Sequence, residues 1–303
     1  MVYAGASIRG KGTFGTELAR FQPFDSQARG GVSVAAAQID GTNADNIIVG
    51  SGPGVPSQVR VYQIPLALSS SAGPALFATF KPYGEDRSGV TVATGFVDFS
   101  TGRESIITAP GAGSPTEVKV FAFPLLKPIA KVDAKAGAKA DHGGLHAMDE
   151  AVNTASFTPF GKDYRGGVSL ATGWLAGSLG GAKRIVVSKL ADGGSVKIFS
   201  SGSALDGGPS LYLQSPEHHG HGAQFREIAS FEPFGGPGGT RVATTSTTTG
   251  ANLLVSGAGP GSADASVIKY DFVRPNAQAT TLEALRLGQV WSGKGSPPGL
   301  GGD

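Results

Sequence analysis

Short apolar runs separated by polar turns recur along the chain and set the expected secondary structure. From residue 80 to 121 the chain reads FKPYGEDRSGVTVATGFVDFSTGRESIITAPGAGSPTEVKVF, with apolar runs at 90–93, 105–109 and 118–121. The runs are short and rich in β-branched residues, and Gly, Pro, Asn and Asp bound them, as is typical of β-strands. The sequence therefore predicts an all-β protein.

The same unit is repeated, and an aromatic-proline corner marks each copy. The corners are FQPF at 21–24, FKPY at 80–83, FTPF at 157–160 and FEPF at 231–234. We expect four units of four strands each, preceded by half a unit at 1–24 that looks like the second half of a copy. The units are expected at 31–83, 89–160, 167–234 and 241–291, and residues 292–303 read as a disordered tail.

A small sheet with two apolar faces cannot bury both faces alone, so its copies must stack. Stacking around an axis gives a β-propeller of four-stranded antiparallel blades, with five blades in all or as a fragment of a larger ring. The corner aromatics would then fill the space between adjacent blades. A β-sandwich is the alternative, but it does not predict the repeated corners. The stretch 280–291 is compatible with a fourth strand or a short helix.

Composition narrows the class of protein. Apolar residues make up 40%, enough for a core, whereas charged residues make up 16% and the net charge is +2, which gives no reason to expect nucleic acid as a partner. The chain has no Cys, which excludes disulfides and thiolate metal sites. No apolar run reaches the roughly 18 residues of a membrane span, and residues 1–12 show no secretory leader.

The repeats resemble a known family. Phe-x-Pro-Phe, Gly-Val-x-Val-Ala, IIVGSGPG at 47–54 and VRVY at 59–62 together resemble bacterial FG-GAP-type propeller repeats, which are similar to the propeller of integrin α-subunits. The resemblance covers residues 2 to about 272 and implies a secreted or cell-surface protein, hence an extracellular or surface location. It specifies fold much more than function.

In this family the turn between the first two strands often binds calcium through several carboxylates. The matching positions here keep one acid in each of the first two units, Asp40 and Asp98, and none in the third until residue 192. We therefore interpret these loops as polar turns, with Asp40 and Asp98 as remnants of a calcium loop.

The histidines suggest a different site. All five lie in two long insertions, which fall between the third and fourth strands of adjacent units: His142, His146, His218, His219 and His221. Equivalent loops emerge on one face of a propeller, so these residues could share a divalent metal ion. Solvated loops are the competing interpretation, and the scattered basic residues Arg165, Lys183 and Arg184 are expected to be solvated as well.

Two functions follow from these observations. The first is a non-catalytic binding or structural module of a bacterial secreted or surface protein, with a protein or carbohydrate ligand on one face and no cofactor. The second is a propeller enzyme, a carbohydrate hydrolase or lyase, with its chemistry in the His-rich loops. A lectin-like module would need an exposed aromatic residue repeated in each unit, and the sequence shows none.

Overall fold

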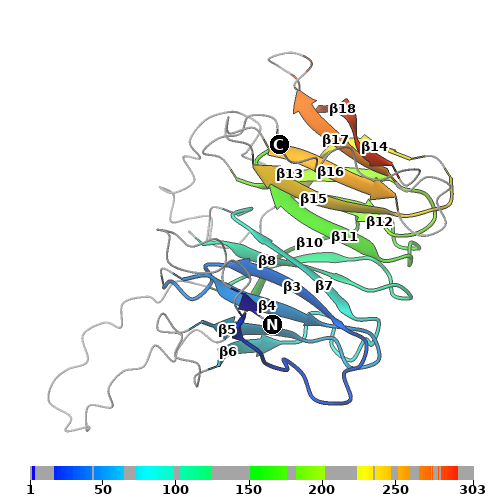
Figure 1. Cartoon of the computed structure of the whole chain (residues 1–303). Coiled ribbons are helices and arrows are strands. Elements are labelled where there is room, and N and C mark those ends of the chain that lie inside the picture. Colours follow the sequence, from blue (N-terminus) through cyan, green and yellow to red (C-terminus); the bar gives the residue numbers. More distant parts are fainter. Residues whose placement is uncertain are drawn as a thin grey trace, which may run out of the picture.

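The computed structural model describes most of the chain as β-strands joined by turns (Figure 1). It describes residues 2–3, 17–42, 44–64, 73–98, 103–123, 151–175, 182–201, 224–234, 236–246, 252–258, 266–273, 275, 279 and 281–292. None of these residues is helical, which confirms the all-β prediction for the described part of the chain, and none forms a helix that could cross a membrane.

The strands form four antiparallel sheets of four strands, each in chain order. Sheet I contains β3 (Val32–Ala37), β4 (Asn46–Ser51), β5 (Val59–Gln63) and β6 (Ala75–Phe80). Sheet II contains β7 (Val90–Gly95), β8 (Ser105–Pro110), β9 (Val118–Ala122) and β10 (Val152–Phe157). Sheet III contains β11 (Val168–Gly173), β12 (Arg184–Lys189), β13 (Val196–Ser201) and β14 (Phe225–Phe231).

Sheet IV contains β15 (Thr240–Ser246), β16 (Asn252–Ala258), β17 (Ser266–Val273) and β18 (Glu283–Ser292). β18 covers most of the stretch that was compatible with either strand or helix, and it is a strand. A two-stranded sheet of β1 (Val2–Tyr3) and β2 (Glu17–Ala19) precedes sheet I. The four-stranded sheets are blade-like, as expected, while the boundaries of the units and the half unit at 1–24 stay a prediction.

The sheets stack in chain order, and their first strands lie side by side: β3 packs against β7, β7 against β11, and β11 against β15. Equivalent threonines on successive first strands, together called the threonine ladder, fix the position of each first strand relative to the first strand of the preceding sheet. Thr94 donates its hydroxyl to the carbonyl oxygen of Ala36 at 2.7 Å, Thr172 donates to that of Thr94 at 2.5 Å, and Thr244 donates to that of Thr172. Each sheet is therefore held to the preceding one at the same strand position.

The interface between two neighbouring sheets, called a seam below, contains an apolar core. Between sheets I and II, for example, Ile48, Val61 and Ile106 have no exposed surface. The corresponding seams of sheets II–III and III–IV are built from the same residue types at the same strand positions. The strands are buried on both faces because each inner sheet is covered on both sides, which explains the near-continuous apolar runs.

The four aromatic-proline corners occupy equivalent places, as expected. The first aromatic ring of each corner contacts an aromatic ring on the third strand of the sheet that follows. The distances between ring centroids are 4.9 Å for Phe21–Tyr62, 4.7 Å for Phe80–Phe121, 4.5 Å for Phe157–Phe199 and 4.8 Å for Phe231–Tyr270. The corners therefore fill the seams.

The Gly-rich turns between second and third strands also have a structural role. The amide of Gly54 donates to the carbonyl oxygen of Arg87 at 2.9 Å, and the amide of Gly113 donates to that of Arg165 at 2.8 Å. Both glycines have φ near +100°, a conformation that residues with a side chain rarely adopt. These turns tie each sheet to the linker that leads into the next.

Candidate functional site

A cleft lies beside sheet I, where the first corner meets the turn between β4 and β5. Its volume is about 470 Å³, within the range of small-ligand sites. Three cationic side chains and one acidic side chain line it: Arg60, Lys81, Arg87 and Asp25. Phe24 also lines the cleft, but the residue is only 7% exposed.

Arg60 is fixed in place by its neighbours. Its Nη1 donates to the carbonyl oxygen of Pro23 at 2.6 Å, and its Nε donates to Oε1 of Gln58 at 3.2 Å. The guanidinium carbon lies 5.0 Å from the centre of the Phe24 ring, a cation–π distance. The charge of Arg60 is therefore presented to the cleft from a rigid position.

Lys81 and Arg87 come from the linker that follows β6. Nζ of Lys81 lies 2.5 Å from Oε1 of Glu85, and both side chains are largely exposed at 47% and 74%. The hydrogen bond from Lys81, with its charge, holds the pKa of the Glu85 carboxyl below its ordinary value. Exposed pairs of this kind contribute little stability, so Lys81 can exchange Glu85 for a ligand carboxylate at small cost. Arg87 donates from Nη1 to the carbonyl oxygen of Gly54 at 3.2 Å.

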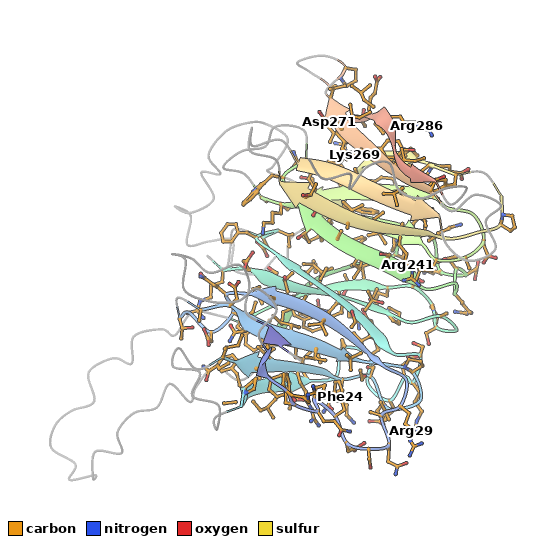
Figure 2. All side chains as sticks on the ribbon, in the orientation of Figure 1. Phe24, Arg29, Arg241, Lys269, Asp271 and Arg286 are labelled. Carbon is orange, nitrogen blue, oxygen red and sulfur yellow. The ribbon has the colours of Figure 1, made fainter. Side chains whose placement is uncertain are left out.

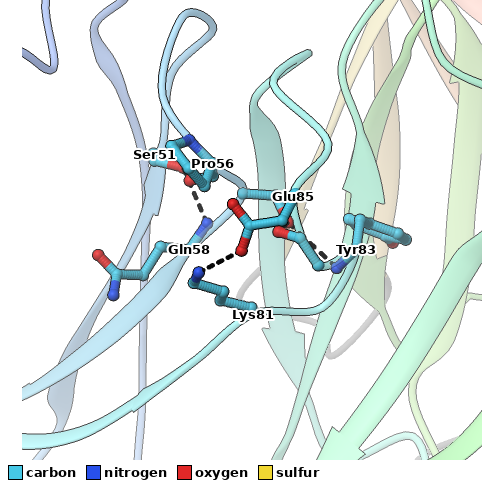
Figure 3. Close-up of polar contacts among 8 residues, drawn as sticks. Ser51, Pro56, Gln58, Lys81, Tyr83 and Glu85 are labelled. Carbon is cyan, nitrogen blue, oxygen red and sulfur yellow. Dashed lines mark hydrogen bonds and ion pairs between the residues drawn. The ribbon is translucent and has the colours of Figure 1, made fainter.

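Hydrogen bonds order the backbone around the cleft (Figure 3). Oγ of Ser51 accepts from the amide of Gln58 at 3.0 Å and donates to the carbonyl oxygen of Pro56 at 3.4 Å. Oγ of Ser57 accepts from the amide of Tyr83 at 3.1 Å, which joins the turn to the second corner. The wall of the cleft is thus preorganised, a property that lowers the entropic cost of binding.

The residues equivalent to Arg60 in the other sheets show which cations of the cleft support the fold and which could bind a ligand. At the position of Arg60, sheet II has Lys119, whose Nζ donates to Pro82 at 3.1 Å and lies 5.0 Å from the Tyr83 ring centre. Sheet III has Lys197, which lies 5.7 Å from the Phe160 ring centre. The cation on the third strand is therefore a recurring support of the corner. In the first cleft Lys81 and Arg87 add two further charges to it.

The loop of Asp40 is closed by its own hydrogen bonds. Oδ1 accepts from the amide and hydroxyl of Thr42 at 2.8 and 2.7 Å, and Oδ2 accepts from the side-chain amides of Asn46 and Gln63, both at 2.9 Å. Partial burial raises the pKa of the Asp40 carboxyl, but these hydrogen bonds outweigh it and leave the pKa below its ordinary value. All four partners are donors, whereas calcium requires several oxygen ligands.

Asp98 follows β7 and is 5% exposed. Asp40 belongs to sheet I and Asp98 to sheet II, and the described residues contain no group of three or more His, Asp or Glu side chains that could hold a metal ion. The calcium interpretation of these two positions stays a prediction. The five histidines lie outside the described residues, so the metal site in the His-rich loops stays a prediction too.

Sequence reasoning was wrong about one basic residue and missed the cleft. Arg184 was expected to be solvated, but it is 1% exposed and donates from Nη1 to Oγ of Ser200 at 3.0 Å. Lys183 pairs with Glu104 at 3.0 Å. The signal that could have revealed the cleft is Lys81, because the equivalent positions of the other three corners carry no cation: Gln22, Thr158 and Glu232.

Comparison with known proteins adds no further constraint. No family model matches the chain, and no curated protein shows significant sequence similarity to it.

Proposed function

We propose that the chain is a non-catalytic binding module, built as a β-propeller of the FG-GAP type and belonging to a bacterial secreted or cell-surface protein. The repeated corners, the threonine ladder and the stacked four-stranded sheets support this architecture. Many unrelated functions share such folds, so the function has to be argued from the site.

The observation that carries the proposal is the rigid cationic cleft beside sheet I. Arg60, Lys81 and Arg87 face one acidic residue, Asp25, so the cleft favours a ligand with carboxylates. Phe24 lies beneath Arg60 and is almost fully buried, so it offers no face on which a sugar ring could stack. The ligand best suited to this cleft is an acidic, extended segment of a protein partner.

Binding of a fluorescently labelled, aspartate- and glutamate-rich peptide tests the proposal. The double variant Lys81→Gln with Arg87→Gln should weaken binding roughly tenfold or more, because each lost charge contact is worth about 1 kcal/mol. Affinity should also fall as salt rises, because exposed charges are screened. Lys162→Gln is the matched control, since Lys162 is an exposed lysine after the third corner and does not line the cleft.

Three results would count against the proposal. Equal binding by the wild type and the double variant would remove the cleft from consideration. A similar loss in the control would show that only net charge matters. Preferential binding of an oligouronate over the peptide would assign the cleft to an acidic carbohydrate instead.

A further inference from the structure

Linkers and turns alternate along one edge of the stacked sheets. The linkers are the segments between a corner and the first strand that follows it, and those of sheets I, II and III are 25–31, 84–89 and 161–167. The turns join second to third strands, at 52–58 in sheet I and 111–117 in sheet II. First strands begin where second strands end, so linkers and turns share this edge.

The turn of sheet I lies between the first two linkers. A Cβ added to Gly30 would come within 2.1 Å of the carbonyl oxygen of Pro53, and one added to Gly89 would come within 2.9 Å of the nitrogen of Pro53. The amide of Gly52 also donates to the carbonyl oxygen of Gly31 at 3.0 Å. The backbone around Pro53 therefore contacts the linkers on both of its sides.

The turn of sheet II lies between the second and third linkers in the same way. The amide of Gly111 donates to the carbonyl oxygen of Gly89 at 2.9 Å, and the amide of Gly113 donates to that of Arg165 at 2.8 Å. The order along this edge is therefore linker, turn, linker, turn, linker. Backbone contacts hold all five segments, so side chains on the linkers start from fixed positions.

Each of the three linkers carries an arginine at the same place. Arg29, Arg87 and Arg165 precede the Gly-Gly or Ser-Gly pair that leads into a first strand, and all three are exposed. Within the part of the chain that the structure describes, none of them forms a salt bridge. Arg87 lines the cleft beside sheet I, and Gln27 and Ala28, next to Arg29, also line it. These three arginines, called the arginine row below, run past the cleft and continue to the linker of sheet III.

Two acidic residues shape the backbone from which the first two arginines leave. Oδ1 of Asp25 accepts from the amide of Gln27 at 3.0 Å. Oδ1 of Asp86 accepts from the amide of Ser88 at 2.8 Å, and its Oδ2 accepts from the hydroxyl of Ser114. Both carboxylates thus close turns of the linkers, which keeps the origins of the neighbouring arginines rigid.

The spacing of the arginine row favours one shape of ligand. Sheets that pack face to face lie about 10 Å apart, so neighbouring arginines of the row are offset by about that distance. A polyproline II segment has three residues per turn and rises about 3.1 Å per residue, so every third side chain lies on one side, about 9 Å apart. In a β-strand, side chains on one side are about 7 or 13 Å apart, and neither distance fits as well.

We propose that the arginine row binds an acidic segment of a protein partner in the polyproline II conformation, with an acidic residue at every third position. The inference rests on the proposed function, which assigns an acidic peptide to the cleft. It adds the conformation of the peptide, the spacing of its acids and two contacts outside the cleft, at Arg29 and Arg165. Guanidinium groups bind carboxylates through paired hydrogen bonds. A polyproline II segment is extended before it binds, which lowers the entropic cost of binding.

Two labelled peptides of one composition separate spacing from charge. EPPEPPE has a glutamate at every third position, whereas PPEEEPP has the same three glutamates side by side, and both are acetylated and amidated so that their ends are neutral. Fluorescence anisotropy should show that the wild type binds EPPEPPE about fivefold or more tightly than PPEEEPP, because only the spaced glutamates reach all three arginines.

Variants outside the cleft test the two added contacts. Arg29→Gln and Arg165→Gln should each weaken binding of EPPEPPE about threefold, and together about tenfold, because each removes one exposed charge contact. Neither should change binding of PPEEEPP by more than about 1.5-fold, since its glutamates fit within the cleft. Arg286→Gln is the matched control, because Arg286 is an exposed arginine on β18, far from Arg29 (Figure 2).

The outcomes distinguish this inference from the proposed function. Equal binding of the two peptides, or unchanged binding of EPPEPPE by the double variant of Arg29 and Arg165, would overturn the inference. The proposed function would still stand in that case if Lys81→Gln with Arg87→Gln weakens binding of PPEEEPP. An equal loss in Arg286→Gln would show that only net charge matters and would also overturn the inference. Failure of the wild type to bind either peptide would overturn both.

Discussion

The aromatic corners should be the main stabilising contacts between neighbouring sheets, and Phe157→Ala tests this at the centre of the stack. The Phe157 ring centroid lies 4.5 Å from that of Phe199, on sheet III, and 5.6 Å from that of Phe225, also on sheet III. Phe157 itself ends β10 of sheet II. The substitution therefore removes aromatic contacts that cross one seam and leaves the strand pairing in place.

The size of the effect follows from burial and ring contacts. Burying a phenylalanine side chain is worth about 1.5–3 kcal/mol, and Phe157 is partly rather than fully buried, which places it at the low end. Each aromatic pair adds about 0.5–1.5 kcal/mol. The sum is about 3 kcal/mol, in line with the 3–5 kcal/mol that Phe→Ala substitutions cost in fully packed cores.

Urea unfolding followed by circular dichroism measures this loss, with Leu285→Ala as the control because Leu285 is 43% exposed. The control should cost less than about 0.5 kcal/mol. In a stack, weakening one seam also lowers cooperativity, so the unfolding of Phe157→Ala should broaden or split into two transitions. A loss below about 1 kcal/mol with an unchanged single transition would refute the reasoning that corners hold the seams.

Four further predictions concern the turns, the ladder, the acids and the histidines. Gly111→Ala should destabilise by roughly 2 kcal/mol or more, because its Cβ would overlap the carbonyl oxygen of Ser88, as a thermal melt will show. Thr172→Val should cost about 1 kcal/mol in urea unfolding, because it deletes the hydroxyl that donates to Thr94. Burial raises the pKa of the Asp86 carboxyl, but its hydrogen bonds outweigh burial and hold the pKa below 3.8. The ionised carboxyl therefore stabilises the folded protein above pH 3.8, and this stabilisation is lost as the pH falls through the lowered pKa. Asp86→Asn should accordingly flatten the acid limb of a curve of stability against pH. The metal hypothesis for the five histidines predicts that zinc binds with a stoichiometry near one per chain in calorimetry, and that glutamine at all five positions abolishes it.

Each of these predictions has a matched comparison. Gly73→Ala should be nearly neutral, because nothing lies within 4 Å of its added Cβ, and equal losses at both glycines would exclude the steric explanation. Thr172→Ser keeps the hydroxyl and should be nearly as stable as the wild type. If Thr172→Ser is as unstable as Thr172→Val, the hydrogen bond of the hydroxyl is not the cause of the loss. If the acid limb of the curve is unchanged in Asp86→Asn, carboxyls other than that of Asp86 dominate the pH dependence of stability. Zinc binding by the glutamine variant would place the metal elsewhere.

Local pattern determined the secondary structure and the repeat. Alternating short runs such as Val90–Gly95 can bury both faces only in a sheet that is covered on both sides, so the strands and their stacking follow from the residues themselves. The role of the corners could also be predicted from the sequence, because an aromatic residue repeated at a fixed place before each first strand is best explained by packing between neighbouring sheets. Boundaries in the last unit were harder, since Leu, Glu and Ala in 280–291 suit a helix by propensity, and pairing with β17 made this stretch a strand.

Tertiary structure decided which charges are structural and which are available. Arg60 and Arg184 are both arginines next to apolar strand residues. Arg184 starts β12, the second strand of sheet III, and is buried there, whereas Arg60 lies on β5, the third strand of sheet I, and lines a cleft. The burial of equivalent valines depends on the stack in the same way. Val34 and Val92 lie in similar local sequences, GVSVAAA and GVTVATG, yet Val34 is 59% exposed and Val92 is 5% exposed, because Val92 packs against sheet I. Sequence alone determines which side chains a sheet offers for packing, whereas the stacking of the sheets determines which of them become buried.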